Sequence, residues 1–146
     1  ASDVYKRQEL IRDLPDAPLW VQAGETRLRQ VLGNLLANAL DALTAKGPPR
    51  RLWLNAEQTA NGVELRIRDN GPGFSEEALQ RAREPFFTTK TSTQGLGLGL
   101  AICDTLMRAL GGELLLANHP EGGALLTLRL RAAAPGVNPH PPEDFA

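Results

Sequence analysis

The spacing of apolar residues changes along the chain, and each spacing predicts a different kind of element. Between residues 25 and 45 apolar side chains recur every three or four positions, which predicts one buried helix face: Leu28, Val31, Leu32, Leu35, Leu36, Ala39 and Leu43. Gly47 and the two prolines after it are typical of a helix end. A second stripe predicts a helix over residues 98–110, before the paired glycines at 111–112: Cys103, Leu106, Met107 and Leu110.

Alternation of apolar and polar residues predicts the strands. The predicted strands are residues 19–21, 51–58, 63–68, 113–118 and 124–131. Asn61-Gly62 lies between the second and third of them and is typical of a two-residue hairpin turn. Together the elements predict an α+β fold, a two-layer sandwich with helices on one face of a mixed, mostly antiparallel sheet.

Polar and proline-rich stretches mark the boundaries of this predicted domain. We expect one domain over residues 15–131, a lead-in or partly non-native linker over 1–14, and a flexible Pro-rich tail over 132–146. Within the domain, Ser75 precedes two glutamates and is expected to cap a short helix. Residues 84–99 have no period and are rich in Thr and Gly, which predicts a loop.

Composition argues against several classes of function. The 146 residues carry 16 Lys and Arg against 17 Asp and Glu, so a strongly basic nucleic-acid binder is not expected. Cys103 is the single cysteine and there are only 2 histidines, which argues against a disulfide, a thiolate zinc site or a His-rich metal centre. No apolar run approaches the ~20 residues of a membrane span. The abrupt start without Met leads us to expect a fragment of a longer protein.

Polar side chains lie at the margin of the long predicted helix. Asn34 and Asn38 are four residues apart and therefore share a face, and Asp41 joins them three residues later. Their oxygens could hold Mg²⁺. The alternative is that these side chains are solvated or cap other backbone groups.

Asp69 follows a predicted strand in the phase of its inward side chains. Residues 63, 65 and 67 are apolar, so the period of two points the Asp69 carboxylate into the core. A buried carboxylate needs partners. These are either the backbone amides of the turn at Gly71–Gly73 or an amino group of a ligand. The two glycines also leave room for a close approach.

Two further signals lie near the start of the second helix. Alternating glycines at 95, 97 and 99 would expose backbone N–H groups at the positive end of the helix, which predicts an anion site or else a flexible hinge. Their spacing fits neither the dinucleotide fingerprint nor the phosphate loop. Phe86 and Phe87, in a Thr-rich stretch before Lys90, predict either a latch over a ligand or ordinary packing beside a solvated charge.

The order of these signals is more specific than any one of them. NLLANALDA, DNGPG, EPFFTTK and GLGLGL, in that order, resemble the N, G1, F and G2 boxes of the sensor histidine kinase catalytic domain. That domain belongs to the superfamily of gyrase, Hsp90, histidine kinase and MutL ATPases. The resemblance runs from about residue 15 to residue 131. The EPFFTTK form, together with Asp41-Ala42, is most similar to nitrogen-regulation and C4-dicarboxylate-type sensor kinases.

The resemblance implies a Bergerat-type ATP-binding fold, with ATP and Mg²⁺ as cofactors. It implies that Asn38 binds Mg²⁺, that Asp69 accepts from the adenine amino group, and that residues 86–95 form a mobile lid. The implied catalytic residues are Asn34, Asn38 and Lys90. The implied nucleotide site comprises Asn34, Asn38, Asp41, Asp69, Gly71, Gly73, Phe86, Thr88, Thr89, Lys90, Gly95, Leu96, Gly97, Leu98 and Gly99.

Asn34 departs from the hydrolytic members of the superfamily, which carry a glutamate base at this position. An amide cannot take a proton from water. We therefore expect the site to align the γ-phosphate for transfer, a reaction that depends mainly on positioning and charge neutralisation.

Neither histidine lies in a context that suits a phosphoacceptor, so the resemblance implies that the acceptor lies on a dimerisation domain missing here. It further implies a downstream response regulator and a monomeric fragment. The fragment would be the cytoplasmic part of a membrane-anchored sensor. Two alternatives remain open: a serine kinase of the anti-sigma-factor type, and a non-catalytic nucleotide-binding module.

Overall fold

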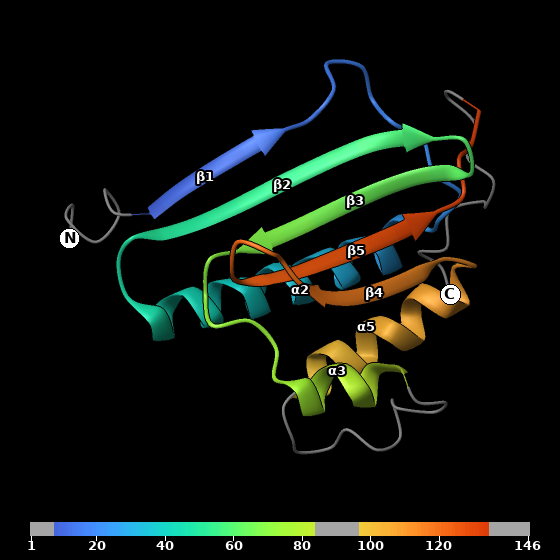
Figure 1. The fold of residues 1–146 in the computed structure, drawn as a ribbon. Helices are drawn as coiled ribbons and strands as arrows, with labels where there is room; N and C mark the ends of the chain where they lie inside the picture. The colour runs from blue at the N-terminus through green and yellow to red at the C-terminus, as the bar shows by residue number, and fades with distance from the viewer. Residues whose placement is uncertain (1–7, 84–96, 135–146) are drawn as a thin grey trace.

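The computed structural model describes residues 8–83 and 97–134, which form two layers (Figure 1). One layer is a sheet of five strands, and the helices cover one of its faces. The elements are β1 (Gln8–Asp13), α2 (Glu25–Lys46), β2 (Arg50–Thr59), β3 (Gly62–Asp69), α3 (Glu76–Arg83), α5 (Gly97–Ala109), β4 (Glu113–Asn118) and β5 (Ala124–Leu130). This confirms the predicted α+β sandwich.

The strand order in the sheet is β1-β2-β3-β5-β4. β1 runs parallel to β2, and the other neighbouring pairs are antiparallel, so the sheet is mixed as predicted. The sequence pattern predicts no strand before residue 19, and β1 is therefore an addition. The strand predicted at residues 19–21 reduces to an isolated bridge between Val21 and Ala132.

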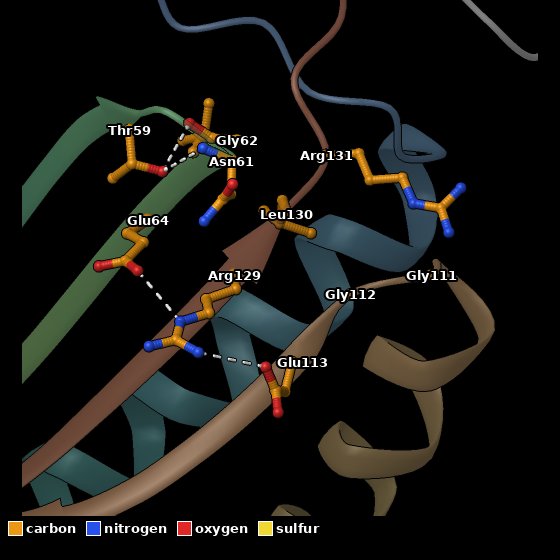
Figure 2. A pocket seen from close by; sticks show the side chains of 11 residues that line it. Thr59, Asn61, Gly62, Glu64, Gly111, Gly112, Glu113, Arg129, Leu130 and Arg131 are labelled. Carbon is orange, nitrogen blue, oxygen red and sulfur yellow. Dashed lines mark hydrogen bonds and ion pairs between the residues drawn. The ribbon is translucent and has the colours of Figure 1, made fainter.

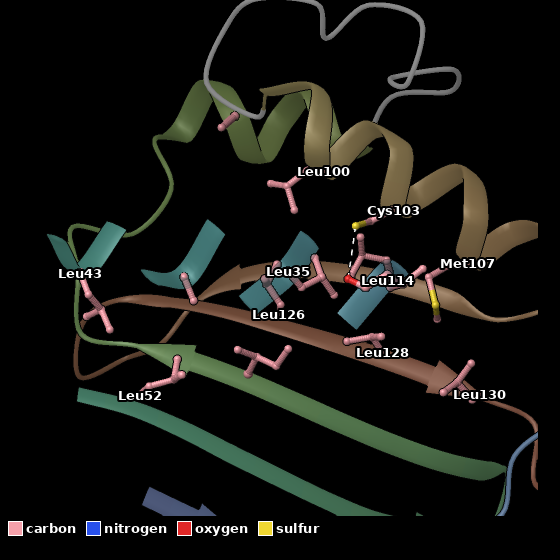
Figure 3. Close-up of a cluster of buried hydrophobic side chains, with 14 residues drawn as sticks. Leu35, Leu43, Leu52, Leu100, Cys103, Met107, Leu114, Leu126, Leu128 and Leu130 are labelled. Carbon is pink, nitrogen blue, oxygen red and sulfur yellow. Dashed lines mark hydrogen bonds between the residues drawn. The ribbon is translucent and has the colours of Figure 1, made fainter. Parts of the chain in front are cut away.

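The core lies between α2, α5 and the covered face of the sheet. Four side chains of α2 that follow the helical period are buried: Val31, Leu35, Ala39 and Leu43. Cys103 and Met107 reach in from α5, and the inward side chains of β5 complete the cluster: Leu126, Leu128 and Leu130 (Figure 3). Truncating a fully buried leucine such as Leu35 to alanine should cost roughly 2–5 kcal/mol.

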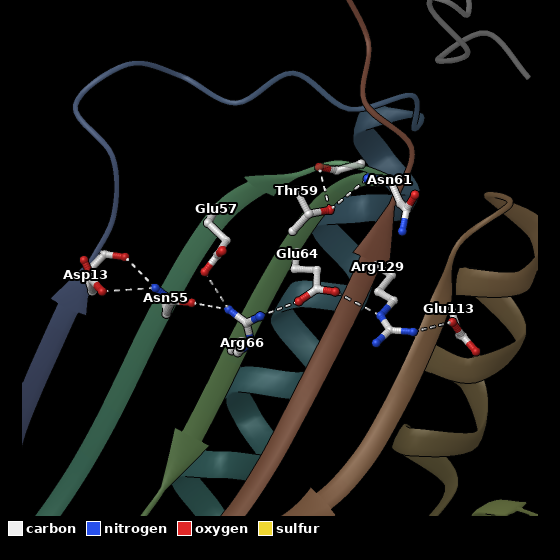
Figure 4. Close-up of polar contacts among 10 residues, drawn as sticks. Asp13, Asn55, Glu57, Thr59, Asn61, Glu64, Arg66, Glu113 and Arg129 are labelled. Carbon is white, nitrogen blue, oxygen red and sulfur yellow. Dashed lines mark hydrogen bonds and ion pairs between the residues drawn. The ribbon is translucent and has the colours of Figure 1, made fainter.

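The helix-free face of the sheet is polar. A ladder of ion pairs and hydrogen bonds crosses all five strands through Asp13, Asn55, Arg66, Glu64, Arg129 and Glu113 (Figure 4). The Arg129 Nε atom lies 3.0 Å from Glu64 Oε2. Exposed pairs of this kind contribute little to stability. They show that this face of the sheet is solvated.

The helix end at Gly47 and the helix cap at Ser75 that the sequence predicts are both present. Gly47 ends α2 with a φ of 87°. The Ser75 hydroxyl accepts a hydrogen bond from the Ala78 amide at 3.1 Å and begins α3, which confirms the predicted cap. None of the helices within the described residues is long and apolar enough to cross a membrane.

Candidate functional site

A cavity of about 190 Å³ lies under the end of the sheet where β3 stops and β5 starts. It is enclosed by α2, the start of α5 and the segment after β3. Its lining residues are Asn38, Ala39, Ala42, Asp69, Gly73, Phe74, Leu100, Ala124 and Leu126. Apolar walls with a few polar groups are typical of small-ligand sites. Asn38 and Asp69 are the polar side chains of this lining, so they determine what the cavity can recognise.

Asp69 ends β3 and points inward, as its phase predicts, with 4% of its surface exposed. Its Oδ1 atom accepts hydrogen bonds from the Gly71 amide at 2.8 Å and the Ala124 amide at 3.4 Å. One of the two partners that the sequence predicts for Asp69, a backbone amide of the turn at Gly71–Gly73, is therefore present. Both of these hydrogen bonds from described residues end on the same oxygen, Oδ1. These bonds leave the acceptor capacity of the second oxygen, Oδ2, unused.

Asn38 lies on α2, one helical turn after Asn34, and lines the cavity together with Asp69. Its Nδ2 atom is buried, and it has no hydrogen-bond partner among the residues that the structure describes. Leaving a buried donor unpaired costs roughly 1–3 kcal/mol. In a native fold a buried donor of this kind normally pairs with an ordered water, an ion or a ligand. Because an asparagine amide can turn over, Asn38 can present either a donor or an oxygen ligand to the cavity.

Glycines allow the turns to approach Asp69. A Cβ atom on Gly123 would lie 1.8 Å from the Asp69 carbonyl oxygen, and Gly123 has a φ of +91°. A side chain is excluded there on both counts. At Gly71 a Cβ atom would lie 3.0 Å from Asp69 Oδ1. The hairpin turn between β4 and β5 therefore packs directly onto the end of β3 and fixes the carboxylate.

The other predicted site residues fall into two groups. Asn34 is half-buried on α2 and Asp41 is exposed, and neither belongs to the lining of the cavity. Gly97, Leu98 and Gly99 form the first turn of α5, immediately before Leu100, which does line it. The rest lie outside the described residues, as does the predicted lid, and remain predictions: Phe86, Thr88, Thr89, Lys90, Gly95 and Leu96.

Two neighbouring titratable groups on α5, Cys103 and Asp104, are buried. Burial raises the pKa of the Cys103 thiol to about 11, partly offset by a hydrogen bond from the Asn34 side chain. A thiol of this kind is inert, because the thiolate is the reactive form. Burial also raises the pKa of Asp104, and the charge of Arg108 partly offsets that effect. The hydrogen bond to Cys103 places the Asn34 side chain against α5.

Sequence reasoning missed most of the cavity wall. Ala42, Phe74, Ala124 and Leu126 line the cavity with apolar side chains that carry no chemical signal. The helical period of α2 places Ala42 near the two asparagines, and the strand phase of β5 points Ala124 inward. Those two could have been found from the sequence pattern, whereas Phe74 depends on how the chain turns after β3.

A larger hollow, of about 630 Å³, lies at the opposite end of the sheet (Figure 2). There Arg129 lies between Glu64 and Glu113, at 3.0 and 3.5 Å, and Arg131 points away from them. The carboxylates of this hollow are thus already paired with an arginine. Unlike the smaller cavity, its lining includes none of the buried side-chain atoms that lack a partner among the described residues. The smaller cavity is therefore the better candidate site.

Comparison with known proteins gives a consistent family. The family model described as "Histidine kinase-, DNA gyrase B-, and HSP90-like ATPase" matches residues 23–134. The chain is 68% identical over 136 residues to the C4-dicarboxylate transport sensor protein DctB of Pseudomonas aeruginosa, covering 93% of the chain and 22% of that protein. It is 38% identical over 116 residues to the tetrathionate sensor histidine kinase TtrS of Salmonella typhimurium, covering 77% and 18%. The chain thus spans about a fifth of the length of these curated relatives.

Solved structures agree with the sequence relatives. The catalytic domain of histidine kinase ThkA superposes with a TM-score of 0.71 at 26% identity, covering 89% of this chain and 84% of that one. Full-length ShkA, solved in complex with AMPPNP, superposes with a TM-score of 0.67 at 28% identity, covering 93% and 28%.

Proposed function

The chain belongs to the histidine kinase-, DNA gyrase B- and HSP90-like ATPase family, as a catalytic domain of the sensor histidine kinase type, and we propose that it binds Mg-ATP and transfers the γ-phosphate to a histidine. The acceptor histidine belongs to a dimerisation domain outside these residues, and a response regulator acts downstream. The observation that carries the proposal is the small cavity, where Asp69 and Asn38 offer buried polar atoms beside the N-terminal end of α5.

In this proposal the adenine base occupies the cavity. The Gly71 and Ala124 amides hold Asp69 Oδ1, and Oδ2 accepts from the adenine amino group. Phe74 and Leu126 supply apolar surface for the faces of the base. The adenine amino group thus faces Asp69 Oδ2, and the adenine ring faces the apolar side chains of the lining.

The phosphates extend from the base toward the N-terminal end of α5. That end carries Gly97 and Gly99, whose backbone N–H groups lack partners within the helix and carry its positive dipole. Lys90 adds a positive charge in this proposal. Asn34 supplies no base, so water is not activated and the γ-phosphate is kept for transfer.

The donor set around the cavity fits a magnesium ion. Within the described residues there is no group of three or more His, Cys, Asp or Glu side chains that could hold a metal alone. Mg²⁺ commonly binds through one or two protein oxygens and completes its shell with water and substrate phosphates. If the amide turns over, Asn38 places its oxygen where the unpartnered Nδ2 atom now lies and can supply one such ligand. The ion, when bound, neutralises charge on the phosphates.

We extend the proposal to the parent protein as a membrane-anchored sensor kinase of the C4-dicarboxylate type, with this domain in the cytoplasm. The support is the 68% identity to a C4-dicarboxylate transport sensor over 93% of the chain. We further propose that the chain is monomeric on its own, because dimerisation is assigned to the other domain.

Phosphate transfer tests the proposal directly. The chain is incubated with Mg²⁺ and γ-labelled ATP, together with a dimerisation fragment from a relative such as DctB. The matched control is the same fragment with its acceptor histidine changed to alanine. Acid-labile label on the histidine fragment alone is the expected result. Acid-stable label would instead indicate a serine kinase, and release of phosphate without transfer would indicate an ATPase.

A further inference from the structure

We propose that Asn118 is a positioning residue that holds the loop after β3 in the shape that receives the adenine base, an inference that rests on the proposed function. Asn118 is the last residue of β4 and lies outside the motifs discussed above. Its side chain meets the backbone of Phe74, which lines the cavity.

A single amide makes both contacts with Phe74. The Phe74 amide donates to Asn118 Oδ1 at 2.7 Å, and Asn118 Nδ2 donates to the Phe74 carbonyl oxygen at 2.9 Å. The side chain thus reproduces the paired donor and acceptor that a neighbouring strand would offer. Among the described residues, these are the hydrogen bonds of the Phe74 backbone. The position of Phe74 therefore depends on Asn118.

Gly73 shows how closely the two segments meet. A Cβ atom at Gly73 would lie 2.7 Å from Asn118 Oδ1, and Gly73 has a φ of +81°. The glycine thus leaves room for the asparagine as well as supplying the backbone conformation. A side chain at position 73 would collide with Asn118, so the close contact between this loop and Asn118 requires glycine there.

The same hairpin also contacts the carboxylate. One residue after Asn118, the His119 amide donates to the Gly123 carbonyl at 2.9 Å, and the turn that this bond closes packs against the Asp69 backbone. The β4–β5 hairpin thereby holds the cavity at two places. It contacts Asp69 through the turn and Phe74 through Asn118, so the distance between the acceptor and the apolar wall is fixed by one element.

Asn118 is itself exposed, which separates positioning from stability. If its amide is removed, the Phe74 N–H and C=O can bond to water, and the fold should persist. The loop then samples other shapes, and the nucleotide must order it again on binding. We expect Asn118→Ala to weaken ATP binding about 5- to 150-fold, which corresponds to the loss of two ordinary hydrogen bonds.

Asn118→Asp should make ATP affinity depend on pH in a way that a general structural defect would not. An ionised carboxylate can accept from the Phe74 amide but repels the Phe74 carbonyl oxygen. The protonated carboxyl group has one acceptor and one donor, as the amide has, and restores both bonds. The affinity of Asn118→Asp for ATP, relative to Asn118→Ala, should therefore rise as the pH falls from about 8 toward 4.

The experiment measures ATP affinity across this pH range for four proteins: wild type, Asn118→Ala, Asn118→Asp and the control Asn61→Ala, which lies in the other hairpin turn. The folded state of each is checked by denaturant unfolding. Wild-type affinity retained by folded Asn118→Ala would overturn the inference. So would an Asn118→Asp defect that stays equal to that of Asn118→Ala at every pH. Failure of the wild type and the control to bind ATP would instead count against the proposed function.

Discussion

Replacing Asp69 with asparagine changes one acceptor in the cavity and little else. The amide oxygen can take the place of Oδ1 and keep the bonds from the Gly71 and Ala124 amides, now at 2.8 and 3.4 Å. The amide nitrogen then takes the place of Oδ2. It presents N–H donors to the adenine amino group, which is also a donor, so the proposed bond is lost.

The size of the effect follows from the charge and burial of Asp69, which is 4% exposed. A hydrogen bond to a charged group contributes roughly 1.5–3 kcal/mol. Its loss should raise the Kd for ATP about 10- to 150-fold. The free energy of unfolding should change by less than about 1 kcal/mol, because both bonds to Oδ1 are conserved in kind.

Calorimetric titration with two nucleotides isolates the amino group. ATP is compared with purine riboside triphosphate, which lacks that group, on the wild type and on Asp69→Asn. The wild type should prefer ATP by the factor above, and the variant should lose most of that preference, because the two changes remove the same bond. Equal ATP affinity of the two folded proteins, or equal affinity of the wild type for both nucleotides, would refute the adenine assignment.

Three further predictions test the other polar groups. Asn38→Ala should abolish the part of ATP affinity that EDTA removes and spare the rest, since an amide oxygen contributes to binding the metal; an equal loss with Mg²⁺ and with EDTA would contradict the metal role. Asn34→Glu should raise phosphate release by the isolated chain, by up to the ~10²–10⁴-fold typical of a general base, and unchanged release would show that water does not reach the γ-phosphate. Asp104→Asn should stabilise the fold at pH 7, because burial raises the pKa of Asp104 in the folded state. The wild type loses stability as the pH rises from about 4 through that raised pKa, so the advantage of the variant in urea unfolding should disappear below about pH 4.

Local geometry made part of the site predictable from the sequence. The period of two in β3 assigned Asp69 to the buried face, and the structure confirms it at 4% exposure. The period of a helix placed Asn38 on the margin of α2, where it lines the cavity. The cap at Ser75 followed from side-chain chemistry that acts within four residues. In each case the cause and the effect lie close together in the chain.

Long-range packing set the rest, and the sequence carried no signal for it. β1 is nearly all exposed at the edge of the sheet, so its side chains show no alternation, and it forms because β2 offers a parallel partner. Phe74 and Asn118 lie on segments that are 44 residues apart and meet only when the β4–β5 hairpin packs beside the loop. An asparagine before a turn has many uses, and only the folded arrangement shows which one applies.

Stability and ligand recognition oppose each other in the smaller cavity. The unpaired Nδ2 of Asn38 costs the fold roughly 1–3 kcal/mol, and an apolar side chain of similar size would avoid that cost. The larger hollow bears no such cost, because Arg129 already pairs with its carboxylates. A ligand that pairs with Asn38 removes this cost in the bound state. Whichever groups it contacts, nucleotide at 100 times its Kd should stabilise the domain by about 2.7 kcal/mol through mass action. The unsatisfied Asn38 amide, rather than the volume, therefore distinguishes the smaller cavity from the larger hollow.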